Sequence, residues 1–72
     1  MTAAAQTAVV AVRGMRCEGC ERTVSGAVRA IPGVGSAEAD FVAEEVAVTF
    51  DAGRTDLAAI RAAVRASGFT PA

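Results

Sequence analysis

A pattern of strand, helix and strand occurs twice along this chain of 72 residues. In its first copy, β-branched residues over 7–12 predict a strand, and apolar residues over 20–31 recur at helical spacing. Gly26 interrupts that helix, and a close approach between helix and sheet is one explanation for it. A second strand is predicted over 37–41, where alanine and phenylalanine alternate with acidic residues.

The second copy follows after a short hairpin. Alternation over 46–50 predicts a third strand, and apolar residues return at helical spacing over 57–66. Thr55 or Asp56 is a suitable N-cap for this second helix. The residues after it leave room for a short last strand, which must lie at a sheet edge because Pro71 lacks a backbone N–H.

The motif Ala-Val-Arg-Ala occurs at 27–30 and again at 63–66, near the end of each predicted helix. Four common residues can recur by chance, but their matching positions favour a doubled strand–helix–strand unit. The order βαββαβ therefore predicts an α+β, ferredoxin-like sandwich. Both helices should cover one face of a four-stranded antiparallel sheet.

Composition restricts the chain to one small domain, 1–72, in which residues 1–6 are expected to be flexible. The net charge is −1 and the seven basic residues, all arginine, form no run, so a nucleic-acid surface is not expected. No apolar run approaches the roughly 18 residues of a membrane span, so direct membrane insertion is not expected. The first residues lack the pattern of an intact secretory signal, which favours the cytoplasm. A mature periplasmic chain is the alternative.

Cys17 and Cys20, the two cysteines of the chain, stand where the strand pattern gives way to the helical one. Cys17 should lie in the loop and Cys20 in the first helical turn, where free N–H groups and the helix dipole favour thiolates. Gly19 would let the backbone fold tightly between the two sulfurs. Glu18 and Glu21 are expected to be surface residues.

Soft sulfur ligands select soft metal ions. Two sulfurs suit Cu(I), Ag(I) and Hg(II), which accept two ligands, whereas structural zinc usually takes four and the chain contains no histidine. A thiol–disulfide redox pair and two thiols without a role are the alternatives to a metal site.

Gly14 and Met15 precede the cysteines, and Pro32-Gly33-Val34 follows the first predicted helix. With the βαββαβ order, this combination resembles the heavy-metal-associated domain family over essentially the whole chain. The segment 46–51 and Gly68-Phe69 also fall where the family has its third strand and the loop after the second helix. The family comprises copper chaperones, metal-binding domains of copper-transporting P-type ATPases, and mercury-binding proteins of mercury resistance.

The resemblance implies that Cys17 and Cys20 ligate the metal and that Met15 supports the loop from the core side. Phe69 would pack near the site. Arg16 stands where zinc-type members often have an acidic residue, which argues against Zn(II). The absence of lysine makes the chain more like the bacterial and ATPase members than the eukaryotic chaperones.

The predicted function is that of a non-enzymatic metal carrier. It would hold Cu(I), for which Ag(I) could substitute, and pass it to a CxxC site of a metal-transporting P-type ATPase or another acceptor protein. A Hg(II)-binding protein or domain of a mercury resistance system is the alternative, because residues 6–7, 48–51 and 68–69 also look like its periplasmic members. We expect a monomer in the metal-free state. A free carrier and a domain of a larger transporter or reductase both remain open.

Overall fold

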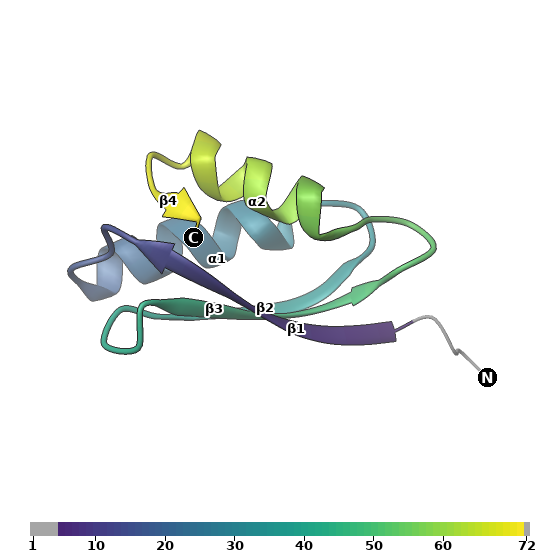
Figure 1. Ribbon diagram of the computed structural model, residues 1–72, viewed down its shortest axis with the longest axis horizontal. Coiled ribbons are helices and arrows are strands. Elements are labelled where there is room, and N and C mark those ends of the chain that lie inside the picture. Colours follow the sequence, from purple (N-terminus) through teal and green to yellow (C-terminus); the bar gives the residue numbers. More distant parts are fainter. Residues whose placement is uncertain (1–4, 72) are drawn as a thin grey trace.

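The computed structural model of the protein describes residues 5–71, and residues 1–4 and 72 lie outside them. The described residues form four strands and two helices in the predicted order (Figure 1). These elements are β1 (Ala5–Arg13), α1 (Glu18–Arg29), β2 (Val34–Asp40), β3 (Glu45–Asp51), α2 (Leu57–Ala66) and β4 (Thr70–Pro71).

The strands form one sheet in the order β2-β3-β1-β4, and every neighbouring pair is antiparallel. Both helices lie over the same face of the sheet, and no helix of the described residues lies over the other face (Figure 1). This is the ferredoxin-like sandwich that the doubled pattern predicts. β4 is a short edge strand as expected, and its Pro71 lies opposite Val12.

The core lies between this sheet and the two helices. Val24 and Val28 of α1 and Ile60 and Val64 of α2 have no exposed surface. They occupy matching positions in the two helices, so the sequence repeat is also a repeat of the core. Alternate residues of the strands complete it, because only one side of each strand faces the helices: Val10, Val12, Ala37, Val46, Val48 and Phe50.

Several element boundaries differ from the predicted ones. Ala5 and Gln6, expected to be flexible, are the first residues of β1 and lie opposite Asp51 and Phe50 of β3. The expectation of flexibility for 1–4 falls outside the described residues. β2 begins three residues earlier than predicted because an irregularity in its register to β3, between Val34 and Ser36, interrupts the alternation.

The explanation offered for Gly26 is wrong. A Cβ built on this residue meets no atom within 4 Å, so neither the sheet nor the second helix approaches it closely. Its place in the middle of α1 should therefore only weaken the helix. Among the described residues, no helix is long and apolar enough to cross a membrane.

Candidate metal centre

The structure brings Cys17 and Cys20 together at one end of the sandwich, where the loop after β1 enters α1 (Figure 1). Their Sγ atoms are 3.2 Å apart, and both cysteines are free thiols. Cys17 is the N-cap of α1 and Cys20 is the third residue of the helix. The predicted placement, one thiol at the loop and one in the first turn, is thus observed, although α1 begins at Glu18 rather than at Cys20.

The N-terminus of α1 is electrostatically suited to negative sulfur. Cys17 has extended backbone angles, and its carbonyl accepts a hydrogen bond from the N–H of Glu21 at 3.2 Å, which closes the first turn. Its side chain makes no capping hydrogen bond. The first N–H groups of a helix have no intrahelical partner and carry the positive end of its dipole. Thiolates at this helix end are therefore stabilised.

The pKa of the Cys20 thiol lies below its ordinary value. A hydrogen bond with the backbone of Arg16 is the main cause, and the neighbouring Cys17 thiol adds to it. Partial burial opposes the shift, because it penalises the charged form. A lowered pKa favours the thiolate, which is the form that binds metal ions.

The two thiols differ in how firmly they are held. Cys20 is half-buried and packs against the core, whereas Cys17 is exposed. A linear sulfur–metal–sulfur unit with bonds of about 2.3 Å needs its sulfurs roughly 4.6 Å apart, so the pair must open by about 1.4 Å to hold such an ion. The exposed Cys17 side chain, which caps no N–H, can rotate outward to open it.

Gly19 contributes space rather than a special backbone. It lies in helical backbone, and a Cβ built on it would sit at 3.7 Å from the Cys17 Sγ, an ordinary contact. The expectation that a glycine is needed here for a tight fold between the sulfurs is therefore wrong. The missing side chain leaves free volume beside the exposed sulfur of Cys17.

Residues just before the cysteines, and Phe69 after α2, support the loop that carries Cys17. Met15 is only 4% exposed and belongs to the hydrophobic core, as the family resemblance implies. Gly14 has a φ of +103°, a conformation that favours glycine, and a Cβ there would lie 3.4 Å from Cδ1 of Phe69. Phe69 thus packs against the start of the loop that leads to Cys17.

Glu21 has a role that periodicity does not reveal. Its Oε2 accepts a hydrogen bond of 2.8 Å from the backbone N–H of Phe41, just after β2. The first turn of α1, which carries Cys20, is thereby joined to the turn between β2 and β3. Glu21 was expected to be a surface residue, and no sequence signal links it to a backbone group 20 residues away.

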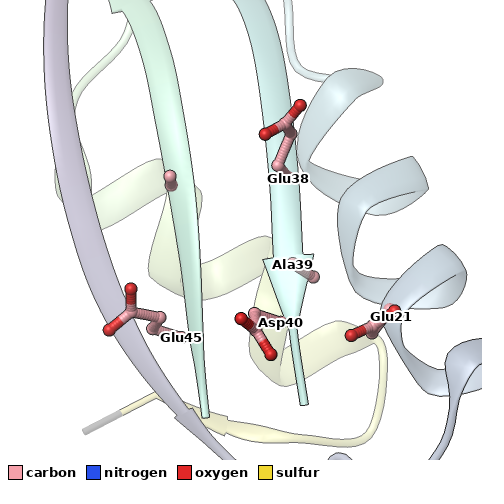
Figure 2. A pocket seen from close by; sticks show the side chains of 6 residues that line it. Glu21, Glu38, Ala39, Asp40 and Glu45 are labelled. Atoms are coloured by element: carbon pink, nitrogen blue, oxygen red, sulfur yellow. The ribbon is translucent and has the colours of Figure 1, made fainter. Parts of the chain in front are cut away.

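A second feature of this end is a hollow rich in carboxylates. Figure 2 shows Glu38 and Asp40 on β2, Glu45 on β3 and Glu21 on α1. Asp40 is engaged locally, because its Oδ1 accepts hydrogen bonds from the N–H groups of Val42 and Ala43 and so holds the turn. Within residues 5–71, no group of three or more His, Cys, Asp or Glu side chains is placed to hold a metal ion.

Comparison with known proteins agrees with the family resemblance seen in the sequence. The family model described as "Heavy-metal-associated domain" matches residues 9–70. The chain is 38% identical over 58 residues to the probable copper-transporting ATPase PacS of Synechococcus elongatus, which covers 81% of this chain but only 8% of the ATPase. It is 34% identical over 67 residues to the mercuric transport protein periplasmic component of Pseudomonas fluorescens, covering 93% of this chain and 74% of that protein.

Among solved structures, the CopZ metallochaperone superposes with a TM-score of 0.91 at 25% identity, over 93% of this chain and 100% of CopZ. The matched family is defined by its association with heavy metals rather than by catalysis, in agreement with the non-enzymatic function predicted. With a family model that spans most of its length and a matching fold, this chain belongs to the heavy-metal-associated domain family.

Proposed function

We propose that Cys17 and Cys20 bind Cu(I) and that the protein passes this ion to the CxxC site of an acceptor protein. The observation that carries the proposal is the pair of free thiols 3.2 Å apart, with Cys20 packed against the core and Cys17 exposed. One sulfur is held by the fold and the other is able to move. Such a pair can retain a soft ion while leaving one side of it open to a partner.

Transfer follows from this low coordination. A thiolate of the acceptor bonds to the ion first, which gives three sulfur ligands, and Cys17 then leaves. A second acceptor thiolate replaces Cys20 in the same manner, so the ion is never released into solution. The two sulfurs left behind can regain protons, and no electron is transferred. Docking would be weak and electrostatic, which suits a short-lived complex.

Copper is supported by the similarity to the PacS ATPase and by the close fold match to CopZ. A metal-transporting P-type ATPase, or another protein with a CxxC site, is then the expected acceptor, and the cytoplasm is the expected compartment. The Arg16 side chain before the first cysteine carries the charge opposite to that expected of a zinc site. Ag(I), which prefers the same ligands, should also bind.

A second candidate is Hg(II) binding in a mercury resistance system. The match to the mercuric transport protein of P. fluorescens extends over more of this chain than the match to PacS, and it covers most of that relative. The same two thiols would bind Hg(II), which also prefers two sulfurs. This function would place the protein in the periplasm.

An anaerobic competition titration tests both candidates. Cu(I) and Hg(II) are each added to the reduced protein in the presence of chelators of known affinity, and the stoichiometry and affinity are compared. We expect one equivalent of metal per chain, lost in the double variant Cys17→Ser and Cys20→Ser. Retention of one equivalent by this variant would show that the cysteines are not the ligands.

Matched controls separate the roles around the site. Met15→Leu keeps an apolar side chain of similar volume but removes the thioether, so it should leave metal affinity unchanged. A large loss of affinity in this variant would make Met15 a ligand. Rapid reduction of insulin disulfides by the metal-free protein would instead favour the thiol–disulfide redox alternative.

A further inference from the structure

The two outer edges of the sheet differ in how well they are protected against pairing with a further strand. On the β2 edge, Nη2 of Arg29 donates a hydrogen bond of 2.9 Å to the carbonyl of Ala37, and Glu21 accepts from the N–H of Phe41 at 2.8 Å. Glu38 and Asp40 place two charges on the same strand. Charges, register irregularities and side chains bonded to the backbone all discourage a further strand from pairing. The β2 edge is therefore closed.

On the opposite edge, the first half of β1 has no pairing strand within the part of the chain that the structure describes. The N–H of Val12 donates to the carbonyl of Glu44, on the β3 side. Successive residues of an antiparallel strand direct their backbone groups to opposite sides, so the residues at even positions face β3 and those at odd positions face away from it. Facing away are Ala5, Thr7 and Val9, which we call the outer-edge residues.

Nothing in residues 5–71 pairs with the outer-edge residues on that side. β4 lies beside β1 only at Val12 and Arg13, and Figure 1 shows the first half of β1 extending away from it. The segment 5–12 has no charged residue, and Val9 is 58% exposed on the sheet face that no helix covers. An uncharged, exposed strand with free backbone groups is the kind of edge that accepts another strand.

We propose that a second copy of this chain pairs its own β1 antiparallel to this edge. A two-fold axis at Thr7 sets Ala5 of one copy opposite Val9 of the other. Outer-edge residues then face outer-edge residues, so each pair can exchange two backbone hydrogen bonds. Because the segment is uncharged, the pairing of two identical strands brings no like charges together, and two-fold pairing is the commonest symmetry of homo-oligomers.

The geometry also separates this pairing from the metal site. β1 runs from the outer-edge residues to the loop that carries Cys17 (Figure 1). In an antiparallel pair, the two cysteine loops lie at opposite ends of the joined sheet, and both stay accessible. The association is thus independent of metal, unlike a dimer bridged by an ion. The proposal differs from the metal-free monomer expected from the sequence, and the measurement of mass described next decides between the two.

Sedimentation equilibrium on the full chain tests the proposal, with the double variant Cys17→Ser and Cys20→Ser in reductant and chelator to exclude bridging by metal or disulfide. The interface is small, so the average mass should rise from 7.2 kDa towards twice that value only between micromolar and millimolar concentration. Val9→Lys should lower the association constant by roughly tenfold or more, because an edge lysine opposes pairing.

The control is Ala47→Lys, which adds the same charge to the same sheet face but on the interior strand β3, opposite Val9. It should leave the association unchanged. Equal losses in both variants would mean that two sheet faces stack, and a mass of 7.2 kDa at every concentration would mean that no pairing occurs. Either result overturns the proposal.

Amide hydrogen exchange tests the pairing of the two β1 strands without a substitution on the edge. At high concentration, the N–H groups of Thr7 and Val9 should become protected, while those of Gln6, Ala8 and Val10, already bonded towards β3, should not change. Protection that rises equally at odd and even positions would contradict strand pairing.

Discussion

The two helices of this protein begin in different ways. Asp56, the N-cap of α2, has φ −147° and ψ 177°, and its Oδ1 accepts a hydrogen bond of 2.9 Å from the N–H of Ala59. Cys17, the N-cap of α1, has nearly the same backbone angles, φ −159° and ψ 170°, but its side chain caps nothing. One helix start is closed by a side chain, and the other is left open beside two thiols.

Elsewhere the helices are alike. Val24 and Val28 of α1 match Ile60 and Val64 of α2, and all four are fully buried. The core therefore holds both helices in the same manner, so the difference between their N-caps does not come from their packing. A missing side-chain cap typically costs about 1 kcal/mol. The comparison teaches that the first half of the repeat tolerates this loss of stability at the helix start that carries the two proposed metal ligands.

The largest loss of stability should follow a substitution among the buried residues that the two helices have at matching positions. Ile60→Ala should lower the free energy of unfolding by about 2–5 kcal/mol, because it leaves a cavity in the core. Val24→Ala should lower it by less, since fewer buried carbons are removed. Urea denaturation followed by circular dichroism measures both. A negligible change in either variant would mean that the two helices are not equally anchored.

The cap of α2 can be removed to make the two helix starts alike. Asp56→Ala should lower the free energy of unfolding by about 1 kcal/mol, because the N–H of Ala59 loses its partner. Asp56→Asn, which keeps an oxygen acceptor, should lose less. The affinity for Cu(I) or Hg(II) should not change in either variant. A clear loss of metal affinity would show that the two helix N-termini are coupled.

The reverse change gives α1 the cap that α2 has. Cys17→Asp should raise the free energy of unfolding by up to about 1 kcal/mol, because a carboxylate can accept from the free N–H groups of the first turn. Metal affinity should fall sharply, because one of the two proposed ligands is gone. Cys17→Ser is the control for loss of the thiol. A variant that is no more stable than Cys17→Ala would show that this N-terminus cannot accept a cap.

The smallest effect concerns the middle of the helices, where Gly26 of α1 matches Ala62 of α2. Both are exposed, and a Cβ on Gly26 meets no atom within 4 Å. Gly26→Ala should therefore raise the free energy of unfolding by about 0.5–1 kcal/mol, and Ala62→Gly should lower it by a similar amount. Thermal unfolding of the two variants measures this. A destabilised Gly26→Ala variant would reveal a constraint on this position.

The order of the elements and the thiol pair could be predicted because they depend on residues that are close together in the sequence. The period of apolar residues gave the order of the elements, and the spacing of Cys17 and Cys20 gave the thiol pair, since residues three apart share one helix face. Element ends were less accurate. β2 extends to Val34 through a register irregularity that no alternation marks, and α1 starts two residues before the predicted position.

The sequence by itself determined which residues alternate, which recur at helical spacing and where two soft ligands stand, because these properties depend on neighbours along the chain. Only the tertiary structure decided that Glu21 bonds to Phe41 and that Arg29 closes the β2 edge. It also decided that half of the β1 edge has no pairing strand among residues 5–71. Such features depend on which segments the packing of the core brings side by side. Nothing in the sequence around a carboxylate on a helix surface indicates the distant N–H group with which it will form a hydrogen bond.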